Sequence, residues 1–455
     1  MDSVLAIVGP IFWGLLMFSI LVFLHEGGHF LAARACGVRV TEFFLGLPFR
    51  WSISRVSKRI GTRFGVTPLL LGGYAMICGM EPTESPCAPR VLSLVHRRGT
   101  VSVDEIAREL GIDADDAMEA CVLLMGWGSI KPVYDPEKGE TPNGRFYPTT
   151  YSSMPRDERG LTVYDGRAFD RAGATEAGES WEPPFSDEAF FEAERSHTYL
   201  GKGFAKRALM LVAGVLVNIL SGFLLLMSIY SIVGISVSQN VSAVGTVEPG
   251  SIAEEAGLSA GDRILEVGDE RPETWEELVL AIREVAGTGE FELVYEHDGD
   301  EHSVDVELDE DEALGITVPT QVVRLNPLDS ASLSFSYVRM TAESILELVN
   351  PSQTLEVLDN STSIVGISVM SYEAASDGAV TYLTLAALIS FSLGFMNLLP
   401  VPPLDGGKLL IEVIQVIIRR PLPLKVQNAL SYIGIVLFGL LFFYVLRGDI
   451  LRFFL

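Results

Sequence analysis

The stretch Leu21-Val22-Phe23-Leu24-His25-Glu26-Gly27-Gly28-His29 ends an apolar run that starts near Val4, and it contains an HExxH motif. On a helix, positions i and i+4 share a face, so His25 and His29 can bind one metal ion while Glu26 lies beside a bound water. Zinc lowers the pKa of such a water toward about 7. Ionisable residues in a membrane span are costly and normally mark function. The motif therefore predicts a catalytic zinc site rather than a polar cluster that only packs helices.

Four apolar runs are each close to the ~20 residues that cross a bilayer. They cover about 4–24, 208–233, 380–399 and 429–446. The first run is too long for a signal peptide and lacks a basic leading segment, so we interpret it as a retained span. The apolar stretch 404–418 is short and is interpreted as the third helix continuing past a break. These runs predict a polytopic α-helical membrane protein with four transmembrane helices, at 1–36, 204–235, 380–418 and 426–447.

The net charge of -26 is concentrated in one loop, because residues 236–379 hold about 30 acidic and about 5 basic side chains. Lys and Arg gather instead after the first span, before the second, and between the third and fourth. The positive-inside rule then places the first and third loops in the cytoplasm, and the acidic loop and both termini outside. We therefore expect a multi-pass protein of the plasma or inner membrane whose HExxH motif lies near the cytoplasmic side. The four cysteines form no CxxC pair, and on that side they stay reduced.

A catalytic zinc ion needs a third protein ligand and an open position. The best candidate is Asp405, in the sequence Asn397-Leu398-Leu399-Pro400-Val401-Pro402-Pro403-Leu404-Asp405-Gly406-Gly407. Its prolines break the third hydrophobic region, so the chain can turn a carboxylate inward there. Alone, the LDGG motif is a weak turn signal, but together with HExxH in a membrane span it becomes a strong one.

The first cytoplasmic loop divides into three segments. Residues 37–80 are apolar and glycine-punctuated, which predicts a membrane-associated β-region. Residues 88–152 resemble a winged helix, an α+β module of three helices and a hairpin, with a capping box at Ser102 and Glu105. Its presumed recognition helix is acidic, which favours a protein contact over nucleic acid, although an insert without a partner stays possible. Residues 153–200 are rich in Gly, Pro and acid and are interpreted as a linker.

The acidic loop contains Val244-Gly245-Thr246-Val247-Glu248-Pro249-Gly250-Ser251 followed by a second glycine-rich stretch. This pattern resembles a bacterial protease-associated PDZ domain over 241–318, which implies an extracytoplasmic, β-rich module. PDZ domains bind extended peptides at a sheet edge, so peptide capture and a rigid size filter are both open. Residues 330–350 show apolar side chains at helical spacing. We expect an amphipathic helix that lies on the membrane or packs on the PDZ domain.

The HExxH and LDGG motifs together resemble the site-2 protease family, in its bacterial branch with a PDZ domain. The resemblance implies a zinc-dependent intramembrane endopeptidase in which His25, His29 and Asp405 bind Zn²⁺ and Glu26 is the general base. It further implies that substrate is bound by Asn397, Gly72, Gly73, Tyr74 and Asn218. Asn218 falls where the family usually shows GPxxN, but the proline is missing in Gly214-Val215-Leu216-Val217-Asn218.

The implied substrates are transmembrane helices of single-pass proteins, such as anti-sigma factors or remnant signal peptides, cut during regulated intramembrane proteolysis. An alternative is a catalytically silent membrane adaptor that presents the PDZ and winged-helix modules. The complete set of His25, Glu26, His29 and Asp405 argues against it. A transporter would predict inverted-repeat hydropathy, and the four spans show none.

Overall fold

The computed structural model describes residues 2–141, 147–309 and 312–453. The chain forms two compact units, one made of Met1–Leu225 with Phe335–Leu455 and the other of Leu226–Ser334. Each unit is described by itself below.

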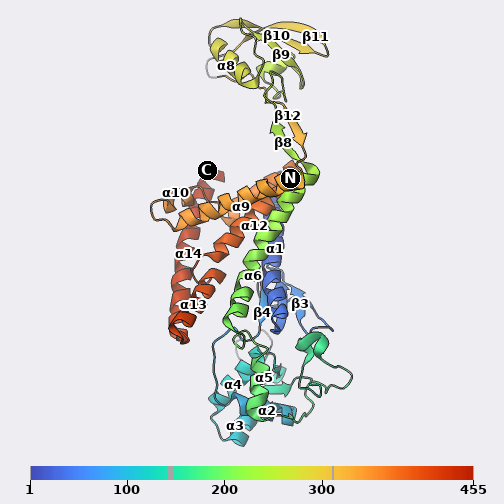
Figure 1. Cartoon of the computed structure of the whole chain (residues 1–455), viewed down its shortest axis with the longest axis vertical. Coiled ribbons are helices and arrows are strands. Elements are labelled where there is room, and N and C mark those ends of the chain that lie inside the picture. The colour runs from blue at the N-terminus through green and yellow to red at the C-terminus, as the bar shows by residue number, and fades with distance from the viewer. Residues whose placement is uncertain (1, 142–146, 310–311, 454–455) are drawn as a thin grey trace. The chain divides into compact units, whose positions relative to one another are not determined.

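Among the described residues, four helices are long and apolar enough to cross a membrane, as the sequence predicted (Figure 1). They are α1 (Asp2–Ala35), α6 (Phe204–Ser228, continued by η3 at Ile229–Val233), α12 (Ala379–Leu398) and α14 (Leu424–Phe453). The expected continuation of the third span is a separate helix, α13 (Asp405–Ile418), after a proline-rich break. Three further helices precede α12: α9 (Pro327–Val349), α10 (Thr354–Asp359) and α11 (Ile364–Asp377).

Glycines let the membrane helices approach one another closely. A Cβ on Gly28 of α1 would lie 2.5 Å from the carbonyl oxygen of Ala213 in α6, and one on Gly222 of α6 would lie 2.8 Å from that of Ala387 in α12. Small residues bring helix backbones together in membranes, where the hydrophobic effect does not drive helices together. The HExxH segment is therefore held directly against the backbone of α6.

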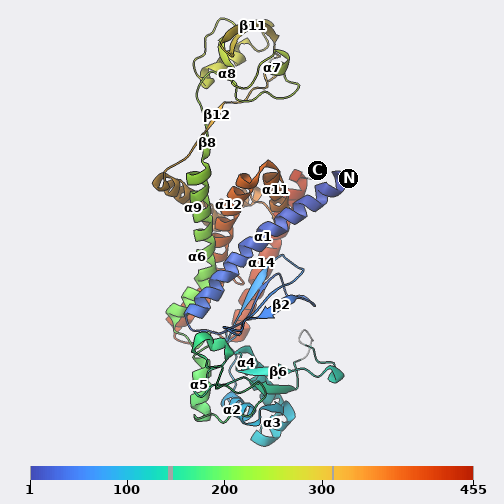
Figure 2. The same cartoon turned by 90° about the vertical axis from the view of Figure 1, so that its right-hand side faces the viewer.

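A four-stranded sheet follows α1, within the predicted β-region, and lies beside the end of that helix (Figure 2). Its order is β2 (Ile53–Val56), β3 (Arg63–Val66), β1 (Val40–Leu45) and β4 (Gly73–Ile77). β4 is an edge strand, paired antiparallel with β1. A Cβ on Gly73 would lie 2.9 Å from the Phe44 carbonyl oxygen and 3.3 Å from Val22 of α1, so glycine allows β4 to pass between them.

The segment predicted to resemble a winged helix contains three helices and a small sheet of order β5-β7-β6 around a shared apolar core. The elements are α2 (Ala88–Arg98), β5 (Thr100–Ser102), α3 (Val103–Leu110), α4 (Ala114–Gly126), β6 (Ile130–Val133) and β7 (Thr150–Ser153). The expected capping box is present, because Ser102 and Glu105 exchange hydrogen bonds at the start of α3.

Residues 153–200, interpreted from their composition as a linker, contain helices and buried side chains in the structure. They include the 3-10 helix η2 (Val163–Ala168) and α5 (Asp187–Arg195), which packs on α2. Arg156 and Glu194 are fully or nearly fully buried. Composition misled here because charged side chains that pair with one another can be buried. The insert therefore extends to the start of α6 as one packed body.

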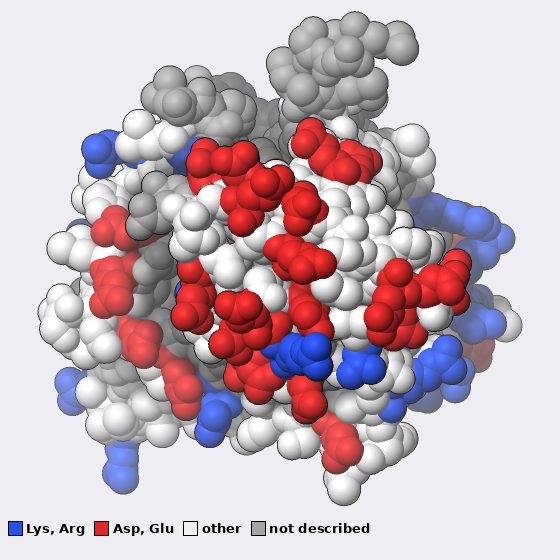
Figure 3. All heavy atoms as spheres, turned by 90° about the horizontal axis from the view of Figure 1, so that it is seen from above, with Lys and Arg blue, Asp and Glu red and all other residues white. Residues whose placement is uncertain are grey.

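The second unit contains a sheet of order β11-β10-β9 with two helices. Its elements are β9 (Arg263–Val267), β10 (Glu290–His297), β11 (Asp300–Glu307), α7 (Ile252–Glu255) and α8 (Trp275–Val285). A separate two-stranded ribbon pairs β8 (Ile235–Ser238) with β12 (Thr320–Val323). Asp and Glu side chains greatly outnumber Lys and Arg on the face seen from above (Figure 3).

Candidate metal centre and catalytic cavity

Three potential metal ligands converge where α1 meets the N-terminus of α13. His25 Nε2 lies 3.1 Å and His29 Nε2 lies 3.0 Å from Oδ2 of Asp405, and the two Nε2 atoms are 3.2 Å apart. All three residues are buried. Ligands 2.0–2.1 Å from a tetrahedral zinc ion would be about 3.3 Å apart. The spacing and the donor types therefore fit a zinc ion with three protein ligands.

Hydrogen bonds from α6 orient both imidazoles. His29 Nδ1 lies 2.7 Å from the Met210 carbonyl oxygen and donates to it, which in the neutral imidazole leaves the lone pair of Nε2 facing Asp405. His25 Nδ1 lies 3.5 Å from Nδ2 of Asn218, whose Oδ1 is buried without a partner among the described residues. Turning this amide over would let Oδ1 accept from Nδ1–H of His25. Such outer contacts fix the tautomer of metal-binding histidines.

Asp405 is placed by the tight turn that precedes α13. A Cβ on either Gly406 or Gly407 would overlap the backbone of residues 398–402, so both glycines of the LDGG motif are required by close packing. The carboxylate starts the helix and faces the histidines through Oδ2. Its other oxygen, Oδ1, lies 3.4 Å from Nζ of Lys408.

A cavity of about 330 Å³ opens beside these ligands. Glu26 lines it, and Oε2 of Glu26 accepts a hydrogen bond of 3.1 Å from the Ala75 amide of β4. This contact leaves the second carboxylate oxygen of Glu26 available to a molecule in the cavity. Ala75 and Ile77 of β4 also line the cavity, so the free edge of the sheet forms one of its walls.

The residues predicted to bind substrate take up different positions. Asn397 lines the cavity, with Nδ2 donating to the Leu393 carbonyl oxygen at 2.9 Å. Tyr74 instead stacks on Phe44 and donates its hydroxyl to Glu42 at 2.9 Å. Gly72 and Gly73 lead into β4. Asn218 is fully buried behind His25 and is outside the cavity lining.

Several cavity residues escaped the sequence analysis because no motif marks them. They include Tyr199, which precedes α6, and Lys408, one turn after Asp405. Gly214 was noted only as part of a family pattern. A Cβ there would lie 2.5 Å from His29 Nε2, so glycine is needed for the ligand to fit. The sequence signal that could have identified this contact is a glycine, Gly214, in a second apolar span of a chain whose first span carries HExxH.

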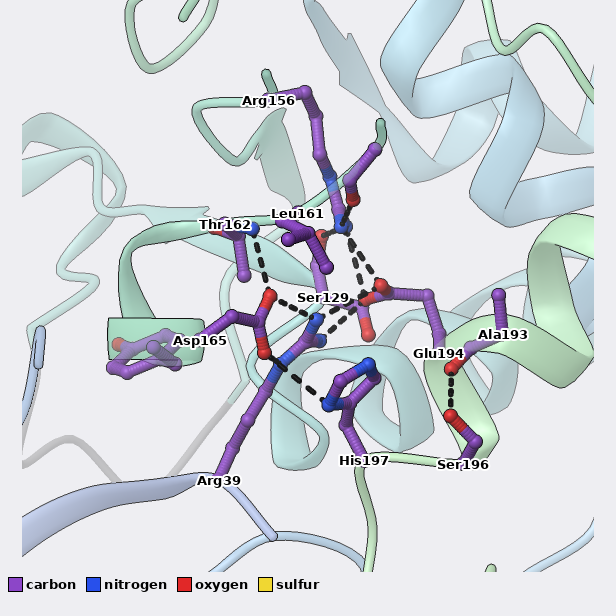
Figure 4. A network of polar contacts seen from close by, with 12 residues as sticks. Arg39, Ser129, Arg156, Leu161, Thr162, Asp165, Ala193, Glu194, Ser196 and His197 are labelled. Carbon is purple, nitrogen blue, oxygen red and sulfur yellow. Dashed lines mark hydrogen bonds and ion pairs between the residues drawn. The ribbon is translucent and has the colours of Figure 1, made fainter. Parts of the chain in front are cut away.

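A second buried polar cluster connects the segment after α1 to the insert (Figure 4). Arg39 pairs with Asp165 at 2.8 Å and with Glu194 at 2.6 Å, and Arg156 pairs with Glu194 at 2.7 Å. Burial alone would raise the pKa of Glu194, but the guanidinium groups of Arg156 and Arg39 hold this pKa well below its usual range. Burial and the charge of Arg156 lower the pKa of His96 to about 3.

Comparisons with known proteins place these features in context. Residues 13–441 match the family model described as Peptidase family M50. The zinc metalloprotease RasP of Geobacillus kaustophilus is 27% identical over 97% of both chains. The regulator of sigma-W protease RasP of Bacillus subtilis is 25% identical over 97% of this chain and 98% of its own. The protease RseP of Yersinia pestis is 26% identical over 97% of this chain and 99% of its own.

Proposed function

The chain belongs to peptidase family M50 and is a multi-pass membrane zinc metalloendopeptidase of the site-2 protease type, and we propose that it cleaves transmembrane segments of single-pass proteins within the bilayer. The observation that supports this most is the convergence of two histidines and an aspartate beside a cavity, with both histidines inside an apolar span. The adaptor alternative is disfavoured by the complete donor set and by relatives that are named proteases.

We assign the metal ligands as His25, His29 and Asp405. Zinc supplies Lewis acidity here, which acidifies water and polarises a peptide carbonyl. Glu26 acts as the general base and then as the acid. Because its Oε2 is occupied by the Ala75 amide, Oε1 takes the proton from the attacking water and passes it to the leaving amine.

The β4 edge is proposed to hold the substrate backbone. A transmembrane helix hides its peptide groups in internal hydrogen bonds, so it must unwind locally before cleavage, and freed groups inside a membrane need new partners. Adding a strand to a sheet edge provides them. Gly73 lets the edge approach Val22 and Glu26 of α1, whereas Gly72 makes room for Leu47. Tyr74 anchors the strand through Glu42. Asn397, which also lines the cavity, is proposed to donate its second amide N–H to a substrate carbonyl.

The surrounding modules receive narrower proposals. We assign 241–318 as an extracytoplasmic PDZ domain, supported by its sheet and α8, with peptide capture and size filtering as its two candidate roles. We assign 88–152 as a cytoplasmic winged-helix-like insert on the same side as the HExxH end of α1. Because the Bacillus subtilis relative is named a regulator of sigma-W, we include membrane-bound regulators such as anti-sigma factors among the substrates, along with remnant signal peptides.

The test is cleavage of a tagged single-pass substrate by the purified full-length chain, compared with Glu26→Gln and with added chelator. We expect turnover to fall about 10²- to 10⁴-fold in Glu26→Gln, as for loss of a general base, with zinc content unchanged. Chelation should remove the metal and the activity together, and added zinc should restore both. Equal cleavage by Glu26→Gln and the native chain would contradict the mechanism.

A further inference from the structure

A second, larger groove of about 1000 Å³ lies in the same unit as the catalytic cavity. One wall comes from the insert, with Leu123, Trp127 and Phe191 as its apolar surface. The Trp127 and Phe191 rings lie 4.9 Å apart. The other wall comes from the end of α13 and the turn into α14.

The groove adjoins the catalytic cavity along two helices. On α6, Met210 lines the cavity and Arg207 lines the groove, which is about 4.5 Å of helical rise. On α13, Lys408 lines the cavity and Gln415 lines the groove, about 10 Å further along. An extended chain covers about 3.4 Å per residue. A substrate that leaves the cavity therefore reaches the groove within about three residues.

On α13, Glu412 lies between the residues that line the cavity and those that line the groove, and it contacts both α6 and the segment before α6. It accepts a hydrogen bond of 3.1 Å from the Tyr199 hydroxyl and lies 3.2 Å from a guanidinium nitrogen of Arg207. The insert wall is also fixed, because Glu194 of α5 is held by Arg39 and Arg156 in the buried cluster of Figure 4. The groove is therefore a built feature of one packed unit.

The charges on the two walls differ in sign. Glu81, Glu84 and Glu188 are exposed on the insert side and form no ion pair among the described residues. Arg207 is matched by Glu412, and Arg195 by Glu192. The exposed Arg419 and Arg420 lie at the turn into α14, where a membrane protein places cations toward lipid head groups.

We propose that this groove binds the basic cytoplasmic flank of the single-pass substrate, with Glu81, Glu84 and Glu188 as the charged contacts and Trp127 and Phe191 as the apolar ones. Cytoplasmic flanks of membrane spans are enriched in Lys and Arg, which matches the three free carboxylates. The proposal rests on the proposed function and its sidedness. It gives the insert a role in substrate selection.

The first experiment compares two single-pass substrates with the same membrane segment, one with a Lys-rich and one with a Gln-rich cytoplasmic flank. The full-length protein is reconstituted in phosphatidylcholine vesicles, so that no anionic lipid competes. We expect kcat/KM to be about tenfold higher for the Lys-rich substrate, the size expected for three exposed ion pairs. The triple variant Glu81→Lys, Glu84→Lys, Glu188→Lys should abolish or invert this preference.

A matched control has the same change in net charge on the insert but outside the groove: Asp104→Lys, Glu158→Lys and Glu176→Lys. These residues are exposed, and Asp104 has the same place in the first turn of α3 that Glu188 has in α5. The control should keep the preference. Loss of preference in both triple variants, or in neither, would overturn the proposal. The double variant Arg419→Gln, Arg420→Gln should keep it, and loss there would contradict the assignment of the preference to the three carboxylates.

A binding measurement separates this proposal from failure of the proposed function. In a Glu26→Gln background, a photo-crosslinking residue replaces Phe191, or Phe185 as an exposed position outside the groove. We expect adducts with the Lys-rich flank at position 191 and far fewer at position 185. Adducts mainly with lipid, or equal yields at both positions, would reject the groove as the docking site even if cleavage is observed.

Discussion

The cluster around Glu194 and the cluster around Asp405 each bury a carboxylate, but they surround it with different partners. Both oxygens of Glu194 receive guanidinium N–H groups, from Arg39 at 2.6 and 3.0 Å and from Arg156 at 2.7 and 2.9 Å. Oδ2 of Asp405 instead faces the Nε2 atoms of His25 and His29.

The difference separates a structural cluster from a ligand-binding one. In the first, every close contact joins a donor to an acceptor, so the charges are balanced within the protein. In the second, His29 already donates Nδ1–H to Met210, so in its neutral form Nε2 points a lone pair at another acceptor. Such a set is completed by a cation. Counting donors and acceptors thus distinguishes two clusters that look equally polar and equally buried.

The largest expected effect comes from removing a ligand of the second cluster. Asp405→Ala should reduce bound zinc from about one ion per chain to near zero, because a two-histidine site lacks the third ligand of catalytic zinc sites. Activity should disappear with the metal, while helical content stays close to native. Metal analysis and circular dichroism measure both, with Asp104→Ala as an exposed control. Full zinc occupancy in Asp405→Ala would show that Asp405 is not a metal ligand.

The first cluster should respond in stability instead. Glu194→Ala leaves two buried guanidinium groups without their shared carboxylate, and breaking a buried ion pair costs about 3–5 kcal/mol. Hydrogen exchange in the insert should accelerate accordingly, whereas zinc content of the folded protein should not change. Glu192→Ala, on the same helix but exposed, should cost under about 1 kcal/mol. Similar exchange in the two variants would show that the cluster contributes little.

A smaller effect is expected one contact away from the metal. Asn218→Ala removes the group behind His25 and should lower zinc affinity about 10- to 100-fold, as for other outer contacts of metal ligands. Competition with a chelator gives the affinity. Asn397→Ala provides the contrast, because this residue lines the cavity without contacting a ligand, and it should reduce turnover while leaving zinc affinity unchanged. Weaker zinc binding in Asn397→Ala, with unchanged zinc binding in Asn218→Ala, would contradict both assignments.

The smallest effect is a pH dependence of the insert. His96 is neutral in the folded state, with a pKa of about 3, but titrates near 6.5 when unfolded. The unfolded state therefore binds more protons below pH 6.5, so stability falls as pH decreases, by about 1 kcal/mol between pH 7 and 5.5. His197, whose pKa is also lowered, adds to this slope. Chemical denaturation at both pH values measures it, and His96→Gln should flatten most of it. An unchanged pH dependence of stability in His96→Gln would show that other groups cause it.

The sequence predicted those parts of the molecule that depend on local spacing or on membrane hydropathy. HExxH brings two imidazoles together because i and i+4 share a helix face, and the four apolar helices follow from run length alone. The prolines before Asp405 indicated a break, and α13 begins at that residue. The capping box of α3 follows from Ser102 and Glu105 in the same way.

Long-range side-chain contacts could not be predicted in this way. Tyr74 contacts Glu42 because β4 pairs with β1. Neighbouring residues of a strand point to opposite faces, so Tyr74 does not share the orientation of Ala75, which lines the cavity. Arg39 meets its partners 126 and 155 residues away, so nothing near it distinguishes it from a surface cation. The acidic, Gly- and Pro-rich segment 153–200 looked solvated, although two arginines neutralise the carboxylate it buries.

The separation of 380 residues between His25 and Asp405 has a consequence for biosynthesis. The HExxH helix is among the first segments to leave the ribosome, whereas the proposed third ligand, Asp405, follows only after the insert, the acidic loop and the third span. A nascent chain halted before that point holds two imidazoles and the proposed general base, Glu26, but lacks the carboxylate of Asp405. The order of translation therefore makes the proposed metal site one of the last features of the molecule to be completed.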